Sequence, residues 1–211
     1  MASAFSGGMS ETPLTALALV CTLKSSPAAS SSEKLAKDIL SELADHHVTG
    51  EVVRVVDFHV SPGVTTDEGP GDEWPVIRKK VLEADILIVS TPTWMGQLPS
   101  VGMQVLERLD AELSEKDEQG RPTMYGKVAI VGVVGNEDGA HHIASQLFQG
   151  LGDVGFTIPA QGSTYWNDEA MGSRDYIDLP QVPEAVASAT KAVAANAAHI
   201  AGLLKDENYP I

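Results

Sequence analysis

The sequence has a single cysteine and few basic residues. Cys21 alone leaves no possible intrachain disulfide and no cysteine-based metal or iron–sulfur cage. The 14 lysines and arginines stand against 29 aspartates and glutamates, so the formal net charge is −15. Neutralising nucleic acid phosphates requires clustered basic side chains, so this balance disfavours a nucleic-acid-binding protein. The lack of disulfides predicts an intracellular, cytoplasmic location.

Long apolar runs and export signals are also missing. Residues Met1–Pro13 are small and polar, with no basic stretch before an apolar one, which predicts a flexible tail rather than a signal peptide. The apolar run Leu14–Leu23 is about half the roughly 20 residues that a membrane span requires. With 43% apolar residues, the composition is typical of a globular protein. We therefore expect a soluble protein with one domain over residues 14–211.

Several functional motifs are absent. No glycine lies between Gly8 and Gly50, which excludes the Gly-x-Gly-x-x-Gly turn and the Walker A loop after the first predicted strand. A tyrosine phosphatase of low molecular weight would need an arginine where Pro27 stands, so Cys21 is predicted to be a buried strand residue. Adjacent His141 and His142 point to different sides of a helix, and no His-Glu-x-x-His pattern occurs. We predict no metal site.

The sequence does contain alternating apolar and helical segments. Five apolar segments are predicted strands: Leu14–Cys21, Glu51–Phe58, Asp85–Ser90, Lys127–Val134 and Phe156–Gln161. Runs that are apolar on both faces are typical of parallel strands covered by helices on both sides. Segments with helical spacing lie between them, and a long alanine-rich helix opens near Pro183. This alternation predicts a three-layer α/β sandwich.

In such a sheet, ligands bind outside the carboxyl ends of the strands, so the loops there carry the functional prediction. After the first strand, Thr22 and Lys24 precede three serines, Ser30, Ser31 and Ser32, that open a helix. Hydroxyls at a helix N-terminus favour an anion such as a phosphate monoester. Ordinary capping of the helix by one of the serines is the alternative interpretation.

The loops after the third and fourth strands carry apolar and hydrogen-bonding groups. After the third strand, Pro92 and Gly96 shape a loop that presents Trp94 and Met95. Such a loop suits a flat conjugated ligand, although Trp94 could equally cover the end of the sheet. After the fourth strand, the glycine-bracketed segment 135–142 is placed to meet the same ligand from the other side.

These segments resemble the flavodoxin-like family of FMN-binding, NAD(P)H-dependent oxidoreductases, which includes NADPH-dependent FMN reductases and flavodoxin-like quinone reductases. The similarity covers about Leu14 to Leu204 and is carried by residues 91–97 and 135–142, with support from Gly71–Pro75. It implies a flavodoxin-like three-layer sandwich with a five-stranded parallel sheet of order 2-1-3-4-5.

The resemblance also implies the cofactor FMN and the residues that hold it. The phosphate would contact Thr22, Lys24, Ser30, Ser31 and Ser32. The ring would lie against Pro92, Thr93, Trp94, Met95 and Gly96, with a backbone N–H near Met95 or Gly96 approaching flavin N5. Its pyrimidine side would meet Gly135, Asn136, Glu137, Asp138, Gly139 and His142. Trp94 and Trp166, the latter in the loop after the fifth strand, would shape the substrate pocket, although Trp166 could equally anchor the core.

The implied reaction takes hydride from NADPH or NADH onto FMN and passes electrons to a quinone, flavin or similar small acceptor. No side chain is then required as a general acid or base. The resemblance further implies a homodimer or homotetramer, whereas the acidic charge balance and the short apolar runs predict no nucleic acid or membrane partner. The chain departs from related subgroups, because its phosphate loop lacks an arginine and it has no cysteine cluster.

Two other functions stay open at this point. A flavodoxin-type electron carrier without NAD(P)H activity is favoured by the charge of −15, because acidic surfaces steer toward basic partners. The long final helix and the insertions at 61–71 and 114–126 favour the reductase. A flavin-free interaction protein on the same fold is the third hypothesis, since fold does not determine function.

Overall fold

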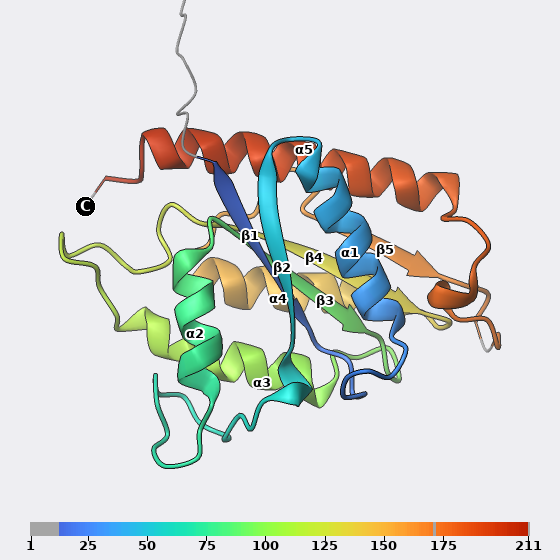
Figure 1. The fold of residues 1–211 in the computed structure, drawn as a ribbon, viewed down its shortest axis with the longest axis horizontal. Helices are drawn as coiled ribbons and strands as arrows, with labels where there is room; N and C mark the ends of the chain where they lie inside the picture. The colour runs from blue at the N-terminus through green and yellow to red at the C-terminus, as the bar shows by residue number, and fades with distance from the viewer. Residues whose placement is uncertain (1–12, 171, 211) are drawn as a thin grey trace, which may run out of the picture.

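The chain forms a five-stranded parallel sheet in the order β2-β1-β3-β4-β5, which confirms the predicted topology (Figure 1). The computed structural model describes residues 13–170 and 172–210, so nearly all of the predicted tail, 1–13, lies outside the described residues. The elements are β1 (Leu14–Val20), α1 (Ser31–Ala44), β2 (Val48–Arg54), η1 (Val55–Asp57), α2 (Trp74–Glu83), β3 (Ile86–Pro92), α3 (Ser100–Leu109), η2 (Asp110–Leu113), β4 (Val128–Gly135), α4 (Ala140–Asp153), β5 (Ser163–Asn167), η3 (Tyr176–Asp178) and α5 (Glu184–Asp206).

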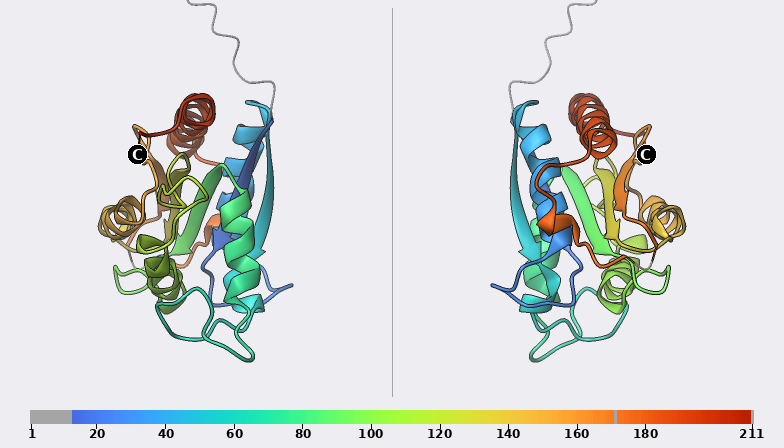
Figure 2. Two further views of the ribbon diagram at one scale, coloured as in Figure 1. Left: turned by 90° about the vertical axis from the view of Figure 1, so that its left-hand side faces the viewer. Right: turned by 90° about the vertical axis from the view of Figure 1, so that its right-hand side faces the viewer.

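Helices cover both faces of the sheet, as the three-layer prediction requires (Figure 2). On one face, Leu17 and Leu19 of β1 join an apolar core with α2, α3 and α4. On the other face, Ala18 and Val20 of the same strand join a second core with α1 and α5. Because successive strand residues point to opposite faces, a strand buried on both sides must be apolar throughout.

The second strand begins three residues earlier than predicted. The apolar pattern predicted Glu51–Phe58, but β2 spans Val48–Arg54 and the chain then turns into η1. Val48 at the start of β2 is buried, the next three residues, 49–51, are exposed at the edge of the sheet, and the backbone pairs with β1 from Leu14↔Val48 onward. An edge strand needs no apolar run, so the apolar pattern identified only the C-terminal part of β2, from Glu51 onward.

The fifth strand was predicted wrongly at Phe156–Gln161. The strand is Ser163–Asn167, and Trp166 therefore lies within β5 rather than in the loop after it. Thr157 makes one parallel bridge with Val128, but Pro159 has no N–H to continue the ladder. As an edge strand, β5 alternates exposed Tyr165 with buried Trp166. It therefore has no apolar run that would distinguish it from its polar neighbours in the sequence.

Cys21 continues the line of β1 and is buried, as predicted. Its N–H donates to the Ser90 carbonyl at 2.8 Å, and burial raises the pKa of its thiol to about 12. Such a thiol is inert at neutral pH. Within residues 13–170 and 172–210, no helix is both long and apolar enough to cross a membrane. The same residues contain no group of three His, Cys, Asp or Glu side chains arranged to hold a metal ion.

Candidate functional site

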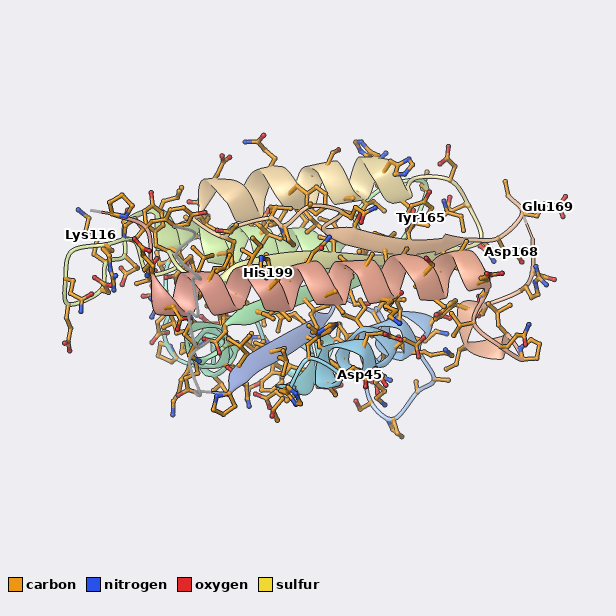
Figure 3. All side chains as sticks on the ribbon, turned by 90° about the horizontal axis from the view of Figure 1, so that it is seen from above. Asp45, Lys116, Tyr165, Asp168, Glu169 and His199 are labelled. Carbon is orange, nitrogen blue, oxygen red and sulfur yellow. The ribbon has the colours of Figure 1, made fainter. Side chains whose placement is uncertain are left out.

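A cavity of about 210 Å³ opens at the carboxyl ends of the strands. Figure 3 shows Asp168 and Glu169 just beyond β5 at this end of the molecule, with Lys116 at the opposite end. The residues lining the cavity are Thr22, Leu23, Lys24, Ser30, Ser31, Ser32, Pro92, Thr93, Trp94, Val134, Gly135, Asn136, Trp166, Asp175 and Tyr176. The cavity thus joins the loop after β1 to the ends of β3, β4 and β5.

One end of the cavity is the N-terminus of α1. Ser30 caps this helix, and its side-chain oxygen accepts the Glu33 N–H at 3.3 Å. The first N–H groups of a helix have no intrahelical acceptor, and together with the helix dipole they attract an anion. Ser31 and Ser32 follow the cap and line the cavity beside Thr22. The capping interpretation is confirmed for Ser30, and anion binding by the serines at the cavity wall stays a prediction.

Arg54, at the end of β2, fixes the loop that precedes α1. Its guanidinium donates to the carbonyls of Lys24 at 3.1 Å and Ala28 at 2.7 Å, and it pairs with the Glu33 carboxylate. The Arg54 side chain is only 6% exposed. The sequence analysis missed this residue, although a lone charge in the apolar run 52–56 is a usable signal, because a buried charge needs partners.

Two carboxylates complete the support of this loop. Asp57 accepts the Ser26 hydroxyl at 2.6 Å and the Ser26 N–H at 2.8 Å, and these hydrogen bonds lower its pKa. Partial burial would raise the pKa of Glu33, but hydrogen bonds from Lys37 and Arg54 outweigh it and lower that pKa. Both carboxylates are therefore ionised at neutral pH.

The other end of the cavity carries a tight turn at residues 94–97. The Trp94 and Gln97 backbones exchange two hydrogen bonds of 3.2 and 3.0 Å. Met95 and Gly96 between them have φ values of 54° and 71°, the signature of a type I′ turn. The Trp94 side chain lines the cavity and is 53% exposed. It does not cover the sheet end as a buried residue, which settles the alternative in favour of an accessible indole.

The segment that follows β4 packs against this turn. The Glu137 carboxylate accepts the Met95 N–H at 2.9 Å, and His142 Nε2 lies 3.0 Å from Gln97 Oε1. Gly139 approaches so closely that a Cβ atom there would lie 2.6 Å from the Gly96 Cα atom. The structure thus brings the two predicted ring-binding segments together.

A third wall of the cavity contains Trp166, which was predicted to shape the pocket, and Tyr176, which was not predicted. Tyr176, in η3, stacks obliquely on Trp166 with ring centroids 5.6 Å apart, and its hydroxyl donates to Asp38 at 2.8 Å. The Ile177 N–H donates to Ser31 Oγ at 3.2 Å, which ties η3 to the start of α1. Burial and the Asp38 carboxylate raise the pKa of Tyr176, so the phenol stays protonated. The irregular stretch 162–181 gave no periodic signal for this wall.

Most of the predicted site residues line the cavity, and the remainder lie beside it. Those outside its lining are Met95, Gly96, Glu137, Asp138, Gly139 and His142. Met95 is 89% exposed, and Asp138 accepts the Gly139 N–H within its own loop. The predicted binding role of each of these residues stays a prediction.

The residues present fit FMN. Thr93 is 4% exposed, and its hydroxyl has no hydrogen-bond partner although it belongs to a residue of the cavity wall. A buried hydroxyl of this kind requires a ligand or water to satisfy it. Serine and threonine donors lie at the helix end, and aromatic rings lie in the same cavity, which matches a phosphate joined to a flat ring. Among the described residues, Lys24 is the one cation in the cavity lining.

Comparison with known proteins supports this fit. The sequence model of the NADPH-dependent FMN reductase family matches residues 16–170. The 8-demethyl-8-aminoriboflavin-5′-phosphate synthase of Streptomyces davaonensis is 32% identical over 174 residues, which are 78% of this chain and 68% of that enzyme. A divalent metal cation transporter, MntH of Mycobacterium bovis, is 36% identical over 169 residues. These are 78% of this chain but only 25% of the transporter, so the chain spans about a quarter of that relative.

Solved structures agree with the sequence comparison. RosB with a bound 8-demethyl-8-formylriboflavin-5′-phosphate intermediate superposes with a TM-score of 0.85 and 30% identity, covering 93% of this chain and 82% of RosB. An oxidoreductase from Corynebacterium diphtheriae has a TM-score of 0.59 and 13% identity, covering 93% of this chain and all of the other, and shows the fold alone. The chain belongs to the NADPH-dependent FMN reductase family, a family of FMN-binding, flavodoxin-like oxidoreductases.

Proposed function

We propose that the cavity binds FMN and that the protein oxidises NADPH or NADH and reduces a small acceptor such as a quinone or a flavin. The observation that carries this proposal is the joining, in one cavity, of a hydroxyl-rich helix N-terminus with the aromatic side chains Trp94, Trp166 and Tyr176. FMN is a phosphate joined to a flat ring, and each end of the cavity suits one of these parts.

In this proposal the chain's own residues bind FMN and orient its ring. Hydroxyls of Thr22 and Ser32, with free N–H groups of α1, would hold the phosphate. Thr93 would give its unpartnered hydroxyl to the ligand between the two ends. Bound FMN would supply hydride chemistry at N5. The turn 94–97 would then orient the ring, and the exposed side of the Trp94 indole would leave room for the nicotinamide or the acceptor.

The visible spectrum of the purified protein, followed by anaerobic titration with each nicotinamide, tests this function. We expect a flavin chromophore, retained or restored by added FMN, that bleaches on addition of NADPH or NADH. Failure to bind added FMN would exclude the proposal. FMN that binds but bleaches only with a partner reductase would instead support the electron carrier, which the charge of −15 favours.

A second candidate is an enzyme whose substrate is FMN itself. It is favoured by the 32% identity to the aminoriboflavin-phosphate synthase and by the TM-score of 0.85 to RosB. Incubation of the protein with FMN in air, followed by mass spectrometry of the released flavin, separates the two. Oxidation of the ring methyl to a formyl group would support this candidate, and unchanged FMN after many turnovers of NADPH would support the reductase.

We further propose a homodimer or homotetramer with no nucleic acid or membrane partner. The outer side of α5 carries small and aliphatic side chains, among them Ala187, Ala195 and Leu203, that permit close packing. Light scattering at moderate salt should give a mass of two or four chains, and the mass of one chain would refute this expectation.

A further inference from the structure

The carboxylate of Glu137 connects the turn 94–97 with the segment after β4. These segments lie at the end of the cavity where we propose that the FMN ring binds, the ring end. Glu137 Oε1 accepts the Met95 N–H at 2.9 Å. Glu137 follows β4, whereas Met95 belongs to the turn after β3, and the two are 42 positions apart in the sequence. This hydrogen bond therefore fixes the turn after β3 to the segment after β4, beside the cavity.

The turn needs such support because of its backbone. Met95 has φ 54°, in the left-handed region that glycine and asparagine occupy in type I′ turns. A side chain there carries an energetic cost, because its Cβ atom crowds the following carbonyl oxygen. Packing of the side chain does not offset the cost, since the Met95 side chain is 89% exposed. A hydrogen bond from its N–H to an ionised carboxylate, which is stronger than one to a neutral acceptor, does offset it.

We propose that Glu137 is a positioning residue with two effects. Its carboxylate holds the turn 94–97, and with it the Trp94 indole, against the segment after β4. Its negative charge beside the ring end of the cavity favours the oxidised over the reduced form of bound FMN. The first effect concerns the protein without any ligand, and only the second rests on the proposed function.

The sign of the second effect follows from electrostatics. Reduction adds electrons to the ring, and a neighbouring carboxylate opposes that addition. Removing the charge therefore shifts the midpoint potential to a more positive value. Glu137→Gln removes the charge but keeps an oxygen that can accept the Met95 N–H. Glu137→Ala removes both, so the pair of variants separates the hydrogen bond from the charge.

Amide hydrogen exchange at Met95, followed by NMR in the protein without FMN, tests the first effect. In Glu137→Ala we expect exchange at this amide to become about tenfold faster, the change for a lost hydrogen bond worth about 1.4 kcal/mol. Glu118→Gln, in the exposed loop between η2 and β4 that also contains Lys116, removes one charge at the far end of the molecule and serves as the control. An unchanged Met95 rate in a Glu137→Ala protein of normal thermal stability would overturn the proposal.

The midpoint potential of bound FMN, measured by anaerobic titration against a reference dye, tests the second effect. Glu137→Gln should have a more positive potential than the original protein, and Glu118→Gln should not. Equal potentials in all three proteins would overturn the charge effect. If the original protein binds no FMN, the proposed function fails, and the Met95 exchange rate still decides whether Glu137 holds the turn.

Discussion

The two ends of the cavity are held in opposite ways. At the end of the cavity where we propose that the phosphate binds, the phosphate end, the loop after β1 is fixed from within by Arg54, whose side chain is 6% exposed. At the ring end, the turn 94–97 is fixed from outside, and Trp94 and Met95 are 53% and 89% exposed. The first arrangement uses a buried charge with several partners, and the second uses single hydrogen bonds that are open to solvent.

This difference matches what each end must do in the proposed reaction. A phosphate group is the same in every catalytic cycle, so the loop that binds it gains from being rigid and already in place. The ring end must admit the nicotinamide and then the acceptor, which requires an accessible surface. Segments with few buried contacts are also those that open with the least free energy. Substitutions at matched positions of the two ends test whether they differ in this way.

The largest effect is expected from Arg54→Met. This substitution leaves the carbonyls of Lys24 and Ala28 without their donor and removes one partner of Glu33. Breaking a buried pair in this way costs about 3 kcal/mol in the free energy of unfolding, and FMN binding should be lost with the loop. Urea unfolding and fluorescence titration with FMN measure the two effects.

Arg174→Met is the matched control for that substitution. Arg174 likewise pairs with a carboxylate, that of Asp168, to which it donates two hydrogen bonds, but its side chain is 64% exposed. An exposed pair contributes about 0–1 kcal/mol. Equal losses of stability in the two variants would show that burial does not distinguish the phosphate end.

The two tryptophans of the cavity provide the next test. Trp166 is 6% exposed and packs on Tyr176, so Trp166→Ala should lower the free energy of unfolding by about 3 kcal/mol. Trp94→Ala should change stability by less than about 1 kcal/mol, since its indole is already half exposed, yet it should weaken FMN binding. A Trp94→Ala protein as unstable as Trp166→Ala would show that the exposed indole of Trp94 stabilises the fold as much as the buried one of Trp166.

The parts of the structure that local patterns specify could be predicted from the sequence. Strands buried on both faces produce apolar runs, and the serines at 30–32 mark the start of α1, so the three-layer architecture and the position of this helix start followed from local patterns. The sheet order was implied by the resemblance to the flavodoxin-like family and is confirmed. The loops after β3 and β4 were predicted to meet because carboxyl ends of parallel strands share one edge.

The parts that depend on distant contacts could not be predicted. Arg54 acts through partners 21 to 30 positions away, and Tyr176 reaches Asp38 across 138 positions. Neither pairing leaves a local pattern in a single sequence. The edge strand β5 was misplaced for a related reason. Its backbone pairing with β4 defines it as a strand, whereas its own sequence has no apolar run that would predict one.

A glycine substitution tests the contact at the ring end. Gly139→Ala would place a Cβ atom 2.6 Å from the Gly96 Cα atom, at a φ of 138° that side chains rarely adopt. We expect a loss of about 1–2 kcal/mol in stability and weaker FMN binding, because the two segments must separate. Gly152→Ala, with no atom within 4 Å of the added group in α4, should be neutral or stabilising by about 0.5 kcal/mol. FMN affinity that is equal in both variants would show that the contact does not shape the ring end.

Acid provides the smallest test, because the two carboxylates that support the loop after β1 are among those whose pKa the folded protein lowers. The folded protein holds the pKa of Asp57 below its usual 3.8 and that of Glu33 below its usual 4.5. A carboxylate with a lowered pKa in the folded state contributes stability above its unfolded pKa and loses that contribution as the pH falls. The urea midpoint should therefore fall between about pH 5 and pH 3, and Asp57→Asn should reduce that fall. The same dependence in Asp57→Asn and the original protein would show that Asp57 is not among the groups through which acid acts, and would leave Glu33 together with the other carboxylates of lowered pKa, among them Asp72 and Asp168.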